Sequence, residues 1–65
     1  MYLNKVKLRD LTFRKGLNQR GIARKTKLSY VVINGIYNGR ATTEETAQKI
    51  AEVLEIPLES ITVKP

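Results

Sequence analysis

The side chains best suited to chemistry lie between residues 19 and 40, and they are hydrogen-bonding groups rather than catalytic ones. Gln19, Asn34 and Asn38 carry amides, and Ser29 carries a hydroxyl. An amide presents a donor and an acceptor together, so an asparagine can pair with N6 and N7 of adenine. The sequence has no His, no Cys and a single Asp, which leaves no nucleophile with its base and no metal-ligand set. We therefore expect a binding site and not an enzyme, with no metal and no cofactor.

Residues 19–26 have the pattern of a short amphipathic helix. Asn18 is a good N-cap before them, since its side-chain oxygen can accept a hydrogen bond from an otherwise unpaired backbone N–H. The outward side of this helix carries an ordinary solvated face of Arg20, Arg24 and Lys25, and the inward side holds Ile22, Ala23 and Thr26. Ala23 is small, as the crossing point of two closely packed helices requires.

A second helix is predicted from about Tyr30 to Tyr37, after a turn at residues 27–28. Ser29 can cap its first turn, and Gly39 supplies the left-handed backbone that commonly ends a helix. Ile33 and Ile36 form its inward stripe, and the residues left facing outward are Tyr30, Val31, Asn34 and Gly35. Two short helices with this spacing predict a helix-turn-helix, whose second helix enters the major groove of DNA.

The spacing of residues across this segment resembles that of the lambdoid phage Cro and repressor family, also called Xre-type regulators. The family pattern is Gln, two variable residues, an aliphatic residue and Ala, followed by a turn and Ser-x-x-x-Ile. The matching residues are Gln19, Ile22, Ala23, Leu28, Ser29, Ile33, Ile36, Asn38 and Gly39. The resemblance extends to residues 50–61 and covers nearly the entire chain. It implies an all-α, lambda-repressor-like fold of five helices, with the helix-turn-helix as helices two and three.

The chain departs from the family pattern at three places. Lys27 occupies the turn position usually taken by Gly, so we expect a non-glycine residue at positive φ, at a cost of ~1 kcal/mol. Thr12 and Tyr37 occupy the positions where many members pair an Arg with a Glu. Both charges are absent together, which avoids a buried unpaired charge. Gly21 and Gly35 lie inside the two helices, each at a cost of ~1 kcal/mol relative to Ala.

The resemblance also implies roles for the residues around the second helix. Base contacts are expected from Ser29, Tyr30, Val31, Asn34 and Gly35, where Val31 offers an apolar contact to a thymine methyl and Gly35 allows close backbone approach. Contacts to the DNA backbone are expected from Gln19, Asn38, Arg40, Thr43, Lys27 and Arg14. Some of these residues have alternatives. Gln19, Asn38 and Ser29 could act only as helix caps, and Tyr30 could cover exposed apolar surface.

Helices are also predicted on both sides of this motif. The first spans about residues 5–15 and ends at Gly16. The fourth begins near residue 43, after Thr42 or Thr43 as its N-cap, and Thr42-x-x-Glu45 fits a capping box. Its inward stripe is Ala47, Ile50, Ala51 and Leu54.

The C-terminal segment is predicted to hold a fifth helix and the dimer contact. Pro57 opens this helix, which runs to about Ile61 and precedes a tail at about residues 62–65. Leu58 and Ile61 either complete the core or face a second copy of the chain. The expected dimer interface consists of Leu58, Ile61 and Val63. All five helices form one domain, residues 1–65, because a chain of this length is large enough for one core only.

Charge is divided unevenly along the chain. Residues 1–40 contain ten Lys and Arg against one Asp, a net charge of +9, and residues 41–65 contain two Lys against five Glu, a net charge of −3. A basic face beside an acidic one orients a protein on a polyanion. The alternative is the solvated surface of an ordinary basic protein. The first thirty residues show no signal peptide or apolar span, so we expect a cytoplasmic protein with no membrane partner.

Together these patterns predict a sequence-specific transcriptional regulator, Cro-like or a small repressor, that binds double-stranded operator DNA. It would act as a homodimer, formed in solution or only on DNA, over half-sites ~34 Å apart. With one small domain, we expect no small-molecule ligand. The alternative is an antitoxin-type protein or another protein-interaction module with the same fold, which would need an exposed apolar groove or a long extension.

Overall fold

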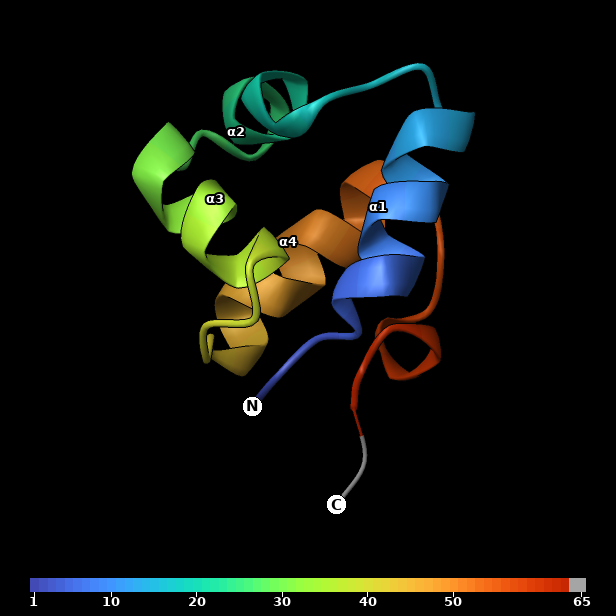
Figure 1. Ribbon diagram of the computed structural model, residues 1–65, viewed down its shortest axis with the longest axis vertical. Coiled ribbons are helices and arrows are strands. Elements are labelled where there is room, and N and C mark those ends of the chain that lie inside the picture. The colour runs from blue at the N-terminus through green and yellow to red at the C-terminus, as the bar shows by residue number, and fades with distance from the viewer. Residues whose placement is uncertain (64–65) are drawn as a thin grey trace.

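A computed structural model describes residues 1–63 as four α-helices followed by one 3₁₀ turn (Figure 1). The elements are α1 (Lys5–Arg14), α2 (Gln19–Thr26), α3 (Tyr30–Tyr37), α4 (Glu44–Leu54) and η1 (Leu58–Ser60). The all-α class is therefore as predicted, but the predicted fifth helix is only the short turn η1. Ser60 N donates to Pro57 O and Ile61 N donates to Leu58 O, both at 3.0 Å, and this spacing of three residues is that of a 3₁₀ helix rather than an α-helix.

Side-chain caps fix the start of each of these helices. Asn18 Oδ1 accepts from Gly21 N at 2.8 Å, and Ser29 Oγ accepts from Val32 N at 3.2 Å, which confirms both predicted caps. Asn4 caps α1 in the same way. The cap of α4 is Thr43, whose hydroxyl accepts from Thr46 N at 3.2 Å. The capping box predicted from Thr42 and Glu45 is therefore wrong, because the chain enters the helix one residue later.

Left-handed residues end the helices and turn the chain. Gly16 and Gly39 have φ values of 69° and 97°, and Lys27 has a φ of 62°, all as expected from the sequence. Glu55 also has a positive φ, 58°, as the C-cap of α4. Its carboxylate pairs with Lys15 Nζ at 2.7 Å, and this contact lowers the pKa of Glu55 below its ordinary value.

The core forms where α2 and α3 pack together, with α4 against α2 and α1 against α3. Its largest fully buried side chains are Leu8, Ile22, Ile33, Tyr37, Ile50, Leu54 and Ile61. In the view of Figure 1, α3 lies on the left and α1 on the right. Ile61 has no exposed surface at all, so its predicted part in a dimer interface is wrong. Its side chain completes the core of the single chain, which is the other placement predicted for it.

The two ends of the chain lie side by side. Leu3 and Thr62 form an isolated antiparallel β-bridge, Asn4 N donates to Ile61 O at 2.7 Å, and Val63 N donates to Tyr2 O at 2.9 Å. Thr62 and Val63 are thus paired with the N-terminal segment rather than part of a tail. The remainder of the predicted tail, residues 64–65, lies outside the described residues.

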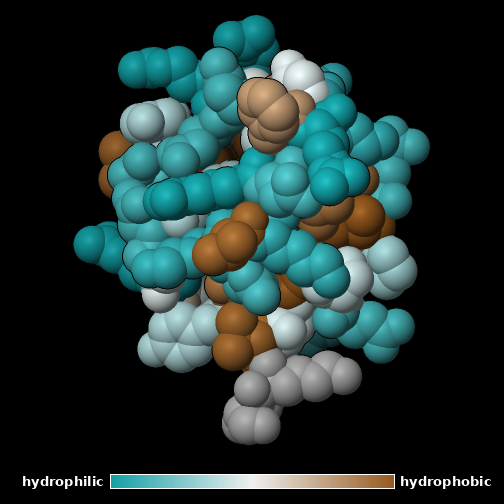
Figure 2. All heavy atoms as spheres, turned by 45° about the vertical axis from the view of Figure 1, so that its right-hand side comes forward, coloured by the Kyte–Doolittle hydropathy of each residue, from teal (hydrophilic) through white to brown (hydrophobic). Residues whose placement is uncertain are grey.

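Hydrophilic side chains cover most of the surface seen in Figure 2, and hydrophobic residues show between them as separate patches. Within residues 1–63, no helix is long and apolar enough to cross a membrane.

Candidate nucleic-acid interface

The turn between α2 and α3 is built from local hydrogen bonds and one left-handed residue. Lys27, at φ 62° and ψ 27°, reverses the chain, and Leu28 N then donates to Ala23 O at 3.1 Å. The buried Thr26 hydroxyl donates back to Ile22 O at 2.8 Å, so it needs no partner outside its own helix. These contacts fix the angle at which α3 leaves α2.

One side of α3 is buried and the other is open to solvent. Ile33 and Ile36 are buried, whereas Val31 exposes 73% of its surface. Residues three and four apart share one face of a helix, so this face also presents Asn34 and Gly35, which are partly exposed, and Tyr30 is exposed at the first turn of the helix. The outward side of α3 is therefore the one predicted from the sequence, and Val31 is free to touch a ligand.

Tyr30 is held by a neighbour that the sequence analysis left on a solvated face. The guanidinium carbon of Arg20 lies 4.7 Å from the centroid of the Tyr30 ring, within the range of a cation–π contact. This contact joins the first turn of α3 to α2 and places a positive charge beside the exposed ring.

A chain of hydrogen bonds links α1, α2 and α3 through their amide side chains. Arg9 Nη2 donates to Asn38 Oδ1 at 3.0 Å, and Asn38 Nδ2 donates to Asn34 Oδ1 at 3.2 Å. Asn34 Nδ2 in turn donates to Gln19 Oε1 at 2.8 Å. We call these four residues the amide relay. The relay brings together three of the residues for which the sequence predicts contacts to DNA.

The direction of the amide relay is set by Arg9. A guanidinium only donates, so Asn38 must turn its oxygen toward Arg9 and its nitrogen toward Asn34, and the same order continues to Gln19. Gln19 therefore accepts through Oε1 and keeps both N–H groups of its amide for another acceptor. Asn34 keeps one N–H and one lone pair, the combination that an adenine edge requires.

Arg9 itself was not predicted from the sequence. Its Nη2 also donates to Tyr37 O at 3.2 Å, one of the carbonyls that the end of α3 leaves unpaired. The last turn of α3 contains no basic residue, so Arg9 brings from α1 the positive charge that stabilises a helix C-terminus. A missing local cation is the only sequence signal, and it does not say which distant residue supplies the charge.

Thr12 and Tyr37, which stand where many relatives carry an ion pair, form a buried neutral pair instead. Thr12 Oγ1 lies 2.6 Å from Leu8 O and 2.7 Å from Tyr37 Oη. Since the threonine has one proton and Leu8 O can only accept, Tyr37 donates to Thr12. Burial raises the pKa of Tyr37 above its ordinary value. The pair joins α1 to α3 without burying a charge.

A shallow hollow on the outward face of α3 gathers several of the predicted contact residues. It is lined by Val31, Asn34, Gly35, Asn38, Gly39 and Arg40. Thr43 lines a neighbouring hollow together with Val31 and Arg40, although its hydroxyl is engaged in capping α4. Ser29 is exposed at the start of α3 and is a cap, as its alternative reading proposed.

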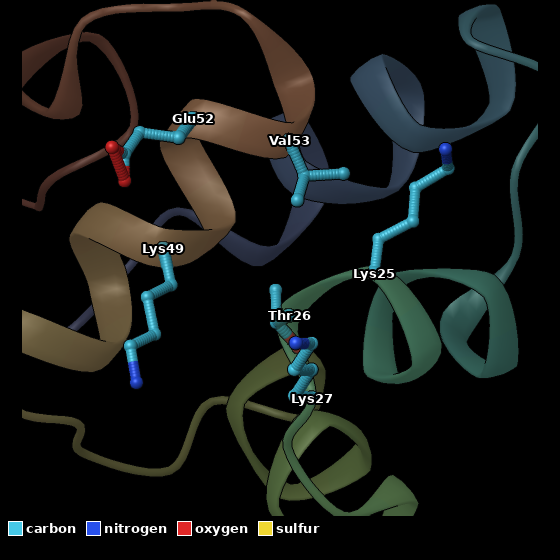
Figure 3. A pocket seen from close by; sticks show the side chains of 6 residues that line it. All are labelled: Lys25, Thr26, Lys27, Lys49, Glu52 and Val53. Atoms are coloured by element: carbon cyan, nitrogen blue, oxygen red, sulfur yellow. The ribbon is translucent and has the colours of Figure 1, made fainter.

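Two of the predicted backbone contacts are not joined to this group. Arg14 pairs with Asp10 at 3.0 Å on the exposed side of α1. Lys27 lines a different hollow, between α2 and α4, with Lys25, Thr26, Lys49, Glu52 and Val53 (Figure 3). Figure 3 shows the side chains of Lys25 and Lys49 pointing in different directions. These lysines do not converge on one point, so the hollow lacks the arrangement of a small-ligand site.

The arrangement of α2 and α3 is that of a known protein family. The family model described as Helix-turn-helix matches residues 7–61, from the first turn of α1 through η1. The chain belongs to the Xre-type helix-turn-helix family. In this helix-turn-helix protein, α2 and α3 are the two helices of the motif, and the family consists of DNA-binding regulators. No curated protein and no solved structure matches the chain.

Proposed function

We propose that this helix-turn-helix protein is a sequence-specific regulator of transcription, Cro-like or a small repressor, that inserts α3 into the major groove of operator DNA. The observation that carries this proposal is the amide relay. Its last two members, Gln19 on α2 and Asn34 on α3, are partly exposed and within residues 1–63 keep donors and acceptors that the relay does not use. These groups are available to a ligand, and the relay holds them in a fixed orientation.

The proposed base contacts follow the outward face of α3. Asn34 would pair with N6 and N7 of an adenine through its remaining N–H and lone pair, and Val31 would contact a thymine methyl. Ser29 and Tyr30 stand at the first turn of α3, the end of a recognition helix that usually reaches the bases. Gly35 would let the backbone approach closely.

The proposed backbone contacts set the register of α3 on the duplex. Gln19 begins α2, so its free amide N–H groups lie beside the positive end of a helix, where a phosphate is favoured. Asn38 lies at the other end of α3 and is held by Arg9. The net charge of +9 over residues 1–40 would add a sequence-independent attraction that weakens as salt concentration rises.

We propose that two copies bind together, because one small module buries limited area on DNA. A two-fold dimer would place its α3 helices in half-sites ~34 Å apart. With Ile61 in the core, the proposed contact reduces to Leu58, which is partly buried beside Pro57, and Val63, which is half exposed. Sedimentation of the free chain and of its DNA complex would measure both assembly states.

Selection from a random duplex library, followed by footprinting, tests the proposal. The wild-type chain is expected to enrich one sequence with two related halves. Asn34→Ala should weaken binding to it by about 1–3 kcal/mol and relax the preference at one base pair. Gln48→Ala removes an exposed amide from α4 and serves as the control. A wild-type chain that enriches no sequence refutes the proposal and leaves a protein-interaction module as the better reading.

A further inference from the structure

Gly35 leaves a bare position on the outward face of α3, one helical turn after Val31. Glycine is unfavourable inside a helix relative to alanine, so its presence in an eight-residue helix calls for a packing reason. Around it lie Val31, Asn34 and Asn38, which line the same hollow. The position therefore stands among the proposed base-reading residues but supplies no side chain of its own.

The side chain of Arg40 lies across this bare position. A Cβ built on Gly35 would stand 3.3 Å from Arg40 Cδ and 3.7 Å from both Cβ and Nε of Arg40. The nearest atom is in the middle of the side chain, and the atoms on either side of it are farther away. The aliphatic stem thus crosses over Gly35, and the guanidinium emerges beyond it. A methyl group at position 35 would press against the stem.

The backbone after α3 holds Arg40 in this place. Gly39, at φ 97°, turns the chain back, and Arg40 N donates to Gly35 O at 2.9 Å. Arg40 also lines the neighbouring hollow beside Val32 and Thr43, so its side chain forms the boundary between two depressions on the same face. Within residues 1–63, its guanidinium has no ion-pair partner. All of its donors are available to a ligand.

We propose that Arg40 reads a guanine in the major groove, in place of a side chain at position 35. The guanidinium is a rigid fork whose N–H groups can pair with O6 and N7 of guanine at once. The missing side chain at Gly35 leaves room for the Arg40 stem, so the guanidinium can reach the groove from a residue outside the helix. This inference rests on the proposed function, and it replaces both the phosphate contact that the sequence predicts for Arg40 and the close backbone approach proposed at Gly35.

The test separates the effect of the positive charge of Arg40 from the effect of the shape of its guanidinium. Binding of each variant is measured by fluorescence anisotropy, on the duplex that the wild-type chain selects and on copies with each G·C pair changed to A·T. Arg40→Lys keeps the charge and loses the fork, so the salt dependence should persist while preference for one G·C pair falls about 10-fold or more. Gly35→Ala should lose the same preference, because its Cβ displaces the Arg40 stem. Arg24→Lys, on the exposed side of α2, is the matched control.

The outcomes separate this inference from the proposed function. Arg40→Lys with undiminished preference at every G·C pair overturns the base-reading role. If Gly35→Ala keeps the full preference for the G·C pair, the claim that Gly35 positions the Arg40 side chain is overturned. A wild-type chain that selects no sequence overturns the proposed function and this inference with it. Circular dichroism melting shows whether each variant is folded, and neither position belongs to the core, since Gly35 lies on the outward face of α3 and Arg40 is exposed after that helix.

Discussion

Replacing Tyr37 by Phe removes one hydroxyl from the core and leaves the ring in place. Tyr37 is 1% exposed and Thr12 is 4% exposed, so no solvent replaces the lost hydrogen bond. Thr12 still donates to Leu8 O, and no buried donor is left unpaired. The loss is that of one neutral hydrogen bond, about 1 kcal/mol. For a domain of this size, the melting temperature should fall by about 4–8 °C.

Thr12→Val should be more damaging, although it also removes one hydroxyl. It leaves the Tyr37 hydroxyl buried without its acceptor, which costs about 1–3 kcal/mol. The double variant removes both partners, so it should be about as stable as Tyr37→Phe alone. Urea unfolding of the four proteins gives the coupling energy directly. Additive losses, or a smaller loss for Thr12→Val than for Tyr37→Phe, would refute the assigned direction of the hydrogen bond.

Three further predictions concern the residues around α3. Burial raises the pKa of Tyr37, so the folded chain holds this proton more tightly than the unfolded chain, and the stability that this adds is complete below pH ~10 and should fall as the pH rises beyond it. Tyr37→Phe should lack this part of the alkaline loss when both proteins are unfolded in urea. The same difference in free energy of unfolding between the two proteins at neutral and at alkaline pH would contradict the prediction. Lys27→Gly should raise the free energy of unfolding by about 1 kcal/mol by relieving the left-handed backbone, with Glu55→Gly as a second site of the same kind, and destabilisation at Lys27 would show that its side chain contributes packing. Arg9→Met keeps the aliphatic stem but removes the donor to Asn38 and Tyr37 O, so it should cost about 1–2 kcal/mol of stability and weaken binding to the selected duplex. Unchanged affinity would show that the amide relay does not contribute to DNA binding.

Local rules account for the parts of the fold that could be predicted from the sequence. The caps at Asn18 and Ser29 and the turns at Gly16, Lys27 and Gly39 depend on residues within about one helical turn, and the structure has all of them. The cap of α4 is Thr43, one of the two predicted threonines, and only the capping box is misplaced by one residue because Thr42 and Thr43 offer the same hydroxyl. Which of these two adjacent threonines caps the helix depends on the backbone conformation just before it.

Contacts between distant residues account for most of what was missed. The hydrogen bond from Arg9 to Asn38 spans 29 residues, and that between Thr12 and Tyr37 spans 25. The family resemblance marked Thr12 and Tyr37 as the positions of an absent ion pair but did not imply that their hydroxyls meet. Ile61 lies in the core, one of the two placements predicted for it, and a local pattern could not choose between them because the choice depends on how the chain ends pair, as Asn4 N does with Ile61 O.

The most direct test of the account is the NMR spectrum of the ¹⁵N-labelled chain with its selected duplex. The side-chain amide signals of Gln19 and Asn34 should shift on binding, because the relay leaves their free N–H groups facing the ligand. Intermolecular contacts should join the Val31 methyls to protons of the major groove. Shifts confined to α1 and α4, with the Gln19 and Asn34 amides unmoved, would contradict the claim that α3 is the reading helix.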